Sequence, residues 1–383
     1  MTDKFLSRRP ALTERRGAPA TVAEPCRVMI VDDSSVVRAV IARSLEQDPS
    51  IKVVSSVANG ALALKVLPTL QVDVILLDIE MPEMDGIEAL PRLLALRPGI
   101  KVIMVSSLTR RSAEISLRAI ALGAADYVPK PSSSLSTADD FRIELLAKVK
   151  AHAARAGRVP GAMRSAATPA PRVSGVAQSG PITLRKAIVE KPTVIAIGSS
   201  TGGPQALSEV LRSIGPGVTQ PIVITQHMPP TFTAILAEHM TRYSERPAAE
   251  AQHGELLKPG RIYVAPGGHH LIAEATPAGA VLRLSDAPPE NSCRPAVDPM
   301  LRSLSAIYGR KLLAVILTGM GYDGMKGCQV VAASGGGVIA QDQASSVVWG
   351  MPGAVAQAGI CNAVLPLGEI GKTIGRIARG EGL

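Results

Sequence analysis

The sequence predicts an α/β protein with two doubly wound domains, each built on a mainly parallel sheet. Two series of short apolar runs, in residues 27–150 and 192–383, alternate with segments of helical periodicity. This alternation favours parallel strands with helices on both faces and a functional site at the carboxyl ends of the strands. Between the two series, residues 151–191 are rich in Ala, Pro, Gly, Ser and Arg and lack periodicity, which predicts a flexible basic linker.

Strands and helices alternate regularly in the first domain. Its strands are predicted at residues 28–31, 51–54, 72–77, 101–105 and 126–128. Its helices are predicted near residues 35–47, 60–70, 86–96 and 111–122, with a last helix opened by Thr137.

The second domain repeats this alternation with one interruption. Its strands are predicted at residues 193–197, 221–225, 262–265, 312–317 and 337–340. Residues 271–273 and 281–284 flank a Pro-Ala-Gly-Ala turn, which predicts an antiparallel hairpin inserted in the parallel pattern.

Composition narrows the class of protein. No apolar run approaches the ~20 residues of a membrane span. Residues 1–26, predicted to be a flexible extension, lack the apolar region of a secretory signal. The cysteines show no C-x-x-C spacing, which favours ordinary small side chains in a reducing cytoplasm over metal ligands. They are Cys26, Cys293, Cys328 and Cys361.

The net charge of +9 comes from segments expected to be flexible. Residues 1–27 hold six basic and three acidic side chains, and residues 151–191 hold seven basic and one acidic. The two folded regions are therefore close to neutral. Since aromatic residues are only 2% of the chain, few side chains are available to stack on bases. Nucleic acid is not an expected partner.

Acidic side chains gather at the predicted strand ends of the first domain. Asp32 and Asp33 follow the first strand, and Asp78 ends the third. Because carboxylates at one sheet edge repel each other, they favour a hard divalent cation such as Mg²⁺. Ser106 follows the fourth strand and Lys130 the fifth, placing a hydroxyl and an ammonium near a phosphoryl group on Asp78. The pattern favours a phosphoacceptor site over simple helix capping.

A glycine-rich turn follows the first strand of the second domain. Residues 198–203 read GSSTGG and precede Pro204, which favours the start of a helix. Gly198, Ser200 and Gly202 match the G-x-S-x-G nucleophile elbow. The same turn would suit a phosphate at a helix N-terminus or a close strand–helix packing, so the turn alone leaves these alternatives open.

His227 and Asp323 are the expected partners of Ser200. His227 directly follows the strand 221–225, at the same predicted sheet edge as Ser200, and is the histidine best placed to act as a base. Asp323 follows the strand 312–317 among glycines whose backbone N–H groups suit an oxyanion. Asp323 is also interpretable as the N-cap of a following helix, and the two roles are compatible.

The first domain resembles response-regulator receiver domains. The resemblance rests on residues 31–34 (VDDS), 77–86 (LDIEMPEMDG), 105–107 (VSS) and 130–131 (KP). It implies a flavodoxin-like fold and makes Tyr127 the switch aromatic.

The receiver resemblance also implies a role for each acidic and polar residue. Asp78 is the implied phosphoacceptor, and Asp32, Asp33 and Asp78 are the implied Mg²⁺ ligands. Ser106 and Lys130 are the implied phosphoryl contacts. Mg²⁺ is the one cofactor expected, for phosphorylation only, and none is expected for the chemistry of the second domain.

The second domain resembles the catalytic domain of the chemotaxis protein-glutamate methylesterases, which implies a Rossmann-like fold. The resemblance rests on residues 198–203, 226–230 (QHMPP), 294–298 (RPAVD), 313–324 and 350–352 (GMP). With the receiver in front, the match covers almost the whole chain from Arg27 onward.

The methylesterase resemblance implies a reaction. Ser200 attacks a glutamyl methyl ester on a chemoreceptor, His227 is the base, Asp323 orients it, and the Met320 backbone N–H binds the oxyanion. Methanol leaves, and water then frees the glutamate. Cys293 departs from the family pattern, because a His commonly stands at this position, and this departure is not expected to touch Ser200, His227 or Asp323.

The implied partners are methyl-accepting chemoreceptors as substrate and a chemotaxis sensor histidine kinase as phosphodonor. The protein is expected to be soluble and cytoplasmic, acting at receptor arrays near the inner membrane face. The receiver face near Ser106 and Tyr127 is expected to cover Ser200 until Asp78 is phosphorylated.

Three alternatives remain open from the sequence. The second domain could be a non-catalytic module that binds a partner or a nucleotide, although no Lys follows the glycine loop as in a Walker sequence. The esterase could serve a chemosensory pathway other than flagellar chemotaxis. The same acyl-enzyme could also deamidate receptor glutamines.

Overall fold

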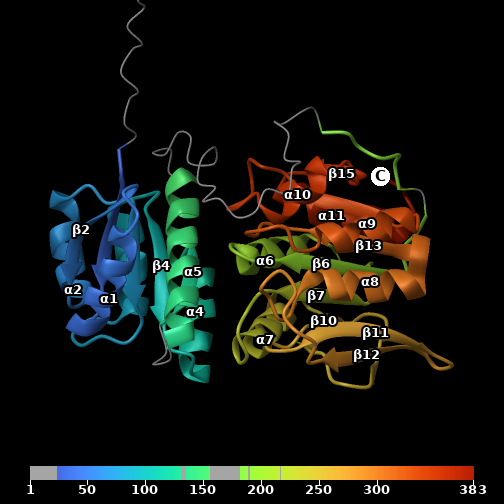
Figure 1. Cartoon of the computed structure of the whole chain (residues 1–383), viewed down its shortest axis with the longest axis horizontal. Coiled ribbons are helices and arrows are strands. Elements are labelled where there is room, and N and C mark those ends of the chain that lie inside the picture. Colours follow the sequence, from blue (N-terminus) through green and yellow to red (C-terminus); the bar gives the residue numbers. More distant parts are fainter. Residues whose placement is uncertain (1–23, 131–134, 156–181, 189, 216) are drawn as a thin grey trace, which may run out of the picture.

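The computed structural model describes residues 24–130, 135–155, 182–188, 190–215 and 217–383. Two parallel sheets, each covered by helices, lie side by side (Figure 1). This arrangement confirms the predicted fold class. Residues 1–23 of the predicted extension and most of the predicted linker lie outside the described residues. Cys26, which was expected in the extension, is instead the buried first residue of the first strand.

The first unit is a five-stranded parallel sheet with the order β2-β1-β3-β4-β5. Its strands are β1 (Cys26–Val31), β2 (Ile51–Val57), β3 (Val74–Asp78), β4 (Lys101–Ser106) and β5 (Asp126–Pro129). Its helices are α1 (Ser35–Glu46), α2 (Gly60–Val66), α3 (Gly86–Leu96), α4 (Arg110–Ala121) and α5 (Leu135–Arg155), with a 3-10 turn at Leu67–Thr69.

Local chemistry accounts for these elements. β3 is buried at every position and reads Val-Ile-Leu-Leu-Asp, as expected of a central parallel strand covered on both faces. Several helices start at a side chain that accepts a hydrogen bond from a backbone N–H of the first turn, which satisfies one of the unpaired donors there. The capping residues are Ser34 for α1, Asn59 for α2, Asp85 for α3 and Thr109 for α4.

The first unit extends beyond the predicted boundary at residue 150. α5 begins at Leu135, before the expected Thr137, and continues to Arg155. His152 and Ala153 are buried, so the last turn belongs to the core rather than to a linker. Buried apolar side chains of α5 continue at helical spacing from Val149 to Ala153, beyond residue 150, where the Ala- and Arg-rich segment begins.

The second unit is a seven-stranded parallel sheet with the order β15-β14-β13-β6-β7-β10-β8. Its strands are β6 (Val194–Ser199), β7 (Ile222–Gln226), β8 (Ala248–Glu250), β10 (Ile262–Val264), β13 (Leu312–Ile316), β14 (Gly337–Gln341) and β15 (Ala363–Leu365). Its helices are α6 (Gly203–Ser213), α7 (Phe232–Ser244), α8 (Val297–Tyr308), α9 (Met325–Ala333), α10 (Met351–Gln357) and α11 (Leu367–Arg379), with a 3-10 turn at Gly309–Lys311.

The predicted hairpin is present and gains a third strand. β11 (His270–Thr276) and β12 (Gly279–Ser285) pair antiparallel, and β9 (Glu255–Leu256) joins β12. The strands that the sequence pattern missed, β8, β9 and β15, have only two or three residues each. Runs this short carry no periodicity.

The two units share an apolar boundary. α4 of the first unit contacts α6 and α7 of the second (Figure 1). The ring of Tyr127 stacks on Phe232 with centroids 4.7 Å apart and an interplanar angle of 14°. Both rings are buried, so one hydrophobic cluster runs from the first unit into the second.

No helix within the described ranges is long and apolar enough to cross a membrane.

The chain segment 182–188, predicted as part of the flexible linker, is attached to the second unit. The Arg185 guanidinium donates to the carbonyl oxygens of Gly336 and Ala332, both at 3.0 Å. Its backbone N–H donates to the Cys361 carbonyl at 2.7 Å, and the Leu383 N–H donates to the Ile188 carbonyl at 3.0 Å. These bonds attach residues 182–188 to the second unit.

Arg185→Ala should lower the free energy of unfolding of the second unit by about 1–3 kcal/mol, since it leaves two carbonyl groups without their charged donor. Urea denaturation monitored by circular dichroism would measure the change. Lys186→Ala is the matched control, because the Lys186 side chain is exposed. Equal stability of the two variants would show that this segment does not stabilise the fold.

Candidate active site

Three neighbouring strands at the centre of the second sheet bring the predicted residues together. β6 lies between β13 and β7, with Gly198 opposite Ile316 and Ser199 opposite Gln226. Since the strands are parallel, their carboxyl ends meet at one edge. Ser200 follows β6, His227 follows β7, and Asp323 lies in the loop after β13.

The Asp323 carboxylate fixes the His227 ring. Asp323 Oδ2 lies 2.8 Å from His227 Nε2. Because the same oxygen also accepts the Val297 N–H at 2.6 Å, and a carboxylate only accepts, Nε2 carries the proton of the neutral ring. Nδ1 is therefore the nitrogen free to act as a base.

This ion pair shifts both pKa values. Burial disfavours the imidazolium, but hydrogen bonds to Asp323 and Cys293 outweigh it and raise the pKa of His227 to about 10. Burial would raise the pKa of Asp323, but His227 and the backbone N–H donors outweigh it and lower it. The Asp323 carboxylate therefore stabilises the imidazolium that forms when Nδ1 accepts a proton.

Asp323 caps a different helix from the one expected. The sequence pattern made it the N-cap of the helix that follows it, but the N-cap of α9 is Gly324. Asp323 instead accepts hydrogen bonds from the first backbone N–H groups of α8, at Val297 and Asp298. The tertiary structure causes this difference, because it places the N-terminus of α8 next to the loop that follows β13.

The turn around Ser200 depends on close approach of the backbone. Gly202 has a φ of +74°, in the left-handed region that favours glycine. A Cβ at Gly319 would lie 2.9 Å from the Ser200 Cβ, so only glycine fits there. Within the described ranges the Ser200 hydroxyl makes no hydrogen bond, which leaves it available to a substrate.

Gln226 ties the serine turn to the histidine loop. Its amide nitrogen donates to the carbonyl oxygens of Ser200 at 3.0 Å and His227 at 3.2 Å, and its amide oxygen accepts from the Ser199 hydroxyl at 2.6 Å. The sequence pattern assigned no role to this side chain. The only signal for it was its position next to His227.

Two backbone N–H groups near Ser200 are candidates for binding an oxyanion. Those of Met320 and Thr201 have no hydrogen-bond acceptor among the described residues. Both residues line the same cavity as Ser200. The methylesterase resemblance implied Met320 but not Thr201, although the residue after an elbow nucleophile commonly supplies such a donor.

The loop before α8 adds two side chains that the sequence analysis did not place here. The Asn291 amide donates to Asp323 Oδ1 at 2.9 Å and to Asp298 Oδ2 at 3.0 Å. The Cys293 Sγ lies 3.4 Å from His227 Nδ1. Thus Asn291 supports the carboxylate, and Cys293 contacts the free nitrogen of the ring.

The cavity of about 550 Å³ at this edge is lined by both units. Ser200, His227 and Met320 line it from the second unit, and Asp126 and Tyr127 from the first. Figure 1 shows α4 and α5 of the first unit on the side that faces the second. The first unit therefore forms part of the wall of the cavity that contains Ser200.

A buried carboxylate of the first unit reaches the serine turn. Asp126 Oδ2 accepts the Gly202 N–H at 3.2 Å, at the start of α6. Burial would raise the pKa of Asp126, but Lys148 and His152 outweigh it and lower it to about 2. Beside this contact, Gln205 Nε2 donates to the Ala124 carbonyl at 2.6 Å. These contacts position the first unit over the turn.

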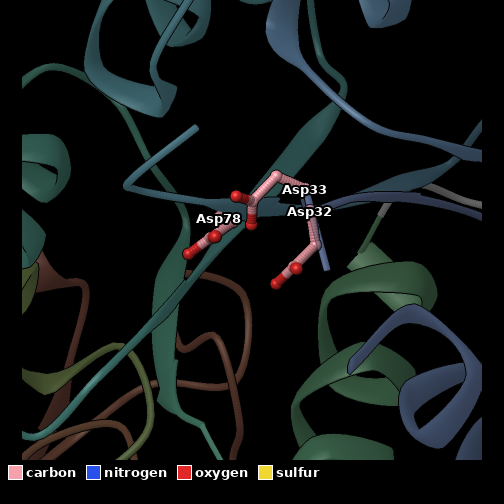
Figure 2. A group of neighbouring side chains, drawn as sticks. All are labelled: Asp32, Asp33 and Asp78. Atoms are coloured by element: carbon pink, nitrogen blue, oxygen red, sulfur yellow. The ribbon is translucent and has the colours of Figure 1, made fainter. Parts of the chain in front are cut away.

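The acidic residues of the first unit form a cluster at the ends of β1 and β3. Figure 2 shows the side chains of Asp32, Asp33 and Asp78 gathered there. Each offers an oxygen, and the three oxygens lie within 4.8 Å of one another. Carboxylate oxygens at this spacing fit a hard divalent cation.

Lys130 completes the acidic cluster. Its Nζ lies 2.9 Å from Asp32 Oδ2 and 2.7 Å from Asp78 Oδ2. Burial and the Asp32 carboxylate raise the pKa of Asp78 to about 6, against the lowering effect of Lys130. Ser106 is buried, and its hydroxyl accepts a hydrogen bond from Ser116 at 3.0 Å. All predicted residues of this cluster therefore lie at one edge of the sheet.

The chain is similar to known proteins over both units. Residues 195–374 match the CheB methylesterase family, and residues 28–138 match the response regulator receiver domain. A protein-glutamate methylesterase/protein-glutamine glutaminase 1 of Paramagnetospirillum magneticum is 55% identical over 378 residues, which covers 94% of this chain and 98% of the relative.

Two further comparisons concern a relative and a solved structure. A protein-glutamate methylesterase/protein-glutamine glutaminase of Azospirillum brasilense is 54% identical over 391 residues, which covers 99% of each chain. The CheB methylesterase catalytic domain of Thermotoga maritima is 42% identical, covers 49% of this chain and 99% of its own, and has a TM-score of 0.48.

Asp323→Asn should lower the pKa of His227 from about 10 toward its ordinary value of 6.5, because the imidazolium loses its counter-charge. An NMR titration of the imidazole resonances would measure this. Because the folded-state pKa is raised, the pair contributes stability that is present below pH 6.5 and lost as the pH rises toward 10.

The control for this titration is Asp286→Asn, which removes the carboxylate next to His269 instead. It should leave the His227 titration where it is in the wild type. An unchanged His227 pKa in Asp323→Asn would contradict the proposed charge coupling.

Proposed function

The chain belongs to the CheB methylesterase family, and from this premise we propose that its cavity hydrolyses methyl esters of glutamate side chains on chemoreceptors. It is a protein-glutamate methylesterase of chemotaxis with a receiver domain that regulates it by phosphorylation. The observation that carries the proposed site is the meeting of Ser200, His227 and Asp323 at the ends of three adjacent strands.

The reaction begins at Ser200. Its Oγ attacks the ester carbonyl carbon while His227 Nδ1 takes the hydroxyl proton, and Asp323 stabilises the imidazolium through Nε2. The carbonyl oxygen becomes an oxyanion at the backbone N–H groups of Met320 and Thr201. Methanol leaves with the proton from Nδ1, and an acyl-enzyme remains on Ser200.

Water completes the cycle. His227 Nδ1 takes a proton from water, whose oxygen attacks the acyl carbon, and the bond to Ser200 breaks. Ser200 recovers its proton, and a receptor glutamate is released. A glutamine side chain would form the same acyl-enzyme with ammonia as the leaving group, which fits the glutaminase activity named for the relatives.

The acidic cluster of the first unit is the proposed phosphorylation site. Asp78 receives the phosphoryl group from a sensor histidine kinase, and Lys130 and Ser106 contact its oxygens. A Mg²⁺ ion held by Asp32, Asp33 and Asp78 would neutralise charge on the phosphoryl group. We place this signalling in the cytoplasm, at the receptor arrays.

Phosphorylation is proposed to open the cavity. β4 and β5 are paired, with Met104 opposite Tyr127, so the strand that ends at Ser106 lies beside the one that carries the interface. A phosphoryl group that draws Lys130 and Ser106 toward Asp78 would move this edge. The Tyr127–Phe232 stack and the Asp126–Gly202 bond would then weaken.

Ser200→Ala should reduce methanol release by about three orders of magnitude or more, because it removes the atom that forms the acyl-enzyme. Release of labelled methanol from methylated receptor membranes measures this. Ser213→Ala, at the far end of α6, is the matched control. Turnover of Ser200→Ala near that of the wild type would refute the nucleophile assignment.

A fragment of residues 182–383 should be about 5- to 150-fold more active than the unphosphorylated full chain, since it lacks the covering unit. It starts at Ile182 so that the Arg185 contacts are kept. A small phosphodonor with Mg²⁺ should activate the full chain but neither the fragment nor full-length Asp78→Asn. Equal activity of fragment and full chain would exclude autoinhibition.

A further inference from the structure

The four cysteines of the chain differ sharply in access to solvent. Cys26, Cys328 and Cys361 are at most 2% exposed, whereas Cys293 is partly exposed and lines the cavity. Burial raises the pKa of Cys26 and of Cys361 to about 12, and it raises the pKa of Cys328 well above its ordinary value. The three buried thiols are therefore poor nucleophiles.

Cys293 lies beside a histidine ring that a carboxylate orients. Its Sγ is 3.4 Å from His227 Nδ1, and the other ring nitrogen donates to Asp323. Transfer of the thiol proton to Nδ1 gives a thiolate beside an imidazolium that the Asp323 carboxylate stabilises. A thiol, an imidazole and a carboxylate in this order are the parts of a cysteine nucleophile with its base.

The loop holds Cys293 in this position. Asn291 and Ser292 have φ values of +52° and +62°, a strained backbone for residues with side chains. Cys293 and Glu290 exchange two backbone hydrogen bonds of 2.9 and 3.1 Å, and the Glu290 carboxylate pairs with Arg302 of α8. The backbone that carries the Cys293 sulfur is therefore held in place by these bonds.

Cys293 and Ser200 compete for one nitrogen. In the proposed reaction Nδ1 must accept the Ser200 proton, yet in the structure its contact is with the Cys293 thiol. A thiol is a weak donor that a serine hydroxyl can displace. If the sulfur carried a larger and more polar group, the Ser200 hydroxyl would displace it from His227 Nδ1 less readily.

We propose that Cys293 is a site of reversible oxidation by hydroperoxides and that the oxidised sulfur disables His227. The thiolate sulfur attacks one peroxide oxygen, the O–O bond breaks, and a sulfenic acid forms on Cys293. The sulfur loses two electrons to the peroxide. With hydrogen peroxide, the leaving hydroxide takes the proton from the imidazolium and becomes water.

The sulfenic acid reverses with a small thiol. One thiol molecule displaces water to form a mixed disulfide, and a second releases the Cys293 thiol and a small disulfide. The proposed loss of esterase activity on oxidation rests on the proposed function. The proposed oxidation of the Cys293 sulfur does not depend on that function. The two parts are therefore tested separately.

The chemical test treats the full chain with hydrogen peroxide in the presence of dimedone, which traps sulfenic acids, and locates the label by peptide mass spectrometry. The label on Cys293 should exceed that on each buried cysteine by about tenfold or more. His227→Gln should reduce the Cys293 label severalfold, whereas His269→Gln, which changes a partly exposed histidine before β11, should not. Ser200→Ala should still be labelled.

The functional test compares the activity of each variant with and without peroxide. The wild type should lose activity and regain it with dithiothreitol, and Cys293→Ser should keep the same fraction of its own untreated activity throughout. Labelling spread evenly over the cysteines, or a Cys293 label that is unchanged in His227→Gln, would overturn the proposed site. Peroxide inactivation that persists in Cys293→Ser would overturn the proposed effect on His227.

Discussion

The Asp323 carboxylate is the interaction on which the candidate active site depends. It accepts hydrogen bonds from the backbone of α8, from Gly324, from the Asn291 amide and from His227. A buried charge with this many donors is held in one orientation, and it would be costly to leave unpaired. The same bonds that stabilise the carboxylate therefore join α8, the loop after β13 and the histidine ring into one rigid unit.

The strand order makes this arrangement possible. β13, β6 and β7 are neighbours at the centre of the sheet, although His227 and Asp323 are 96 residues apart in the chain. Each strand ends at the same edge, so a short loop from each is enough to place its side chain. The Gln226 amide donates to the carbonyl oxygens of both Ser200 and His227. It thereby connects the loop after β6 to the loop after β7 and sets the position of Ser200 relative to the His227 ring.

The receiver unit lines part of the cavity that contains Ser200. Asp126 binds the backbone at the start of α6, and Tyr127 stacks on Phe232 of α7. Both residues belong to β5, the strand that also leads to Lys130 of the acidic cluster. A change at Asp78 therefore has a short physical route, through one strand, to the turn that carries Ser200.

The sequence by itself determined the two α/β units and the positions of Ser200, His227 and the acidic cluster at strand ends. These follow from apolar runs and the polar residues that end them, and such patterns are local. The tertiary structure alone decided that Asp323 caps α8, that Cys293 contacts the His227 ring and that Asp126 reaches Gly202. Those contacts depend on which strands are neighbours and on loop backbones such as that of Asn291, and no short periodicity encodes either.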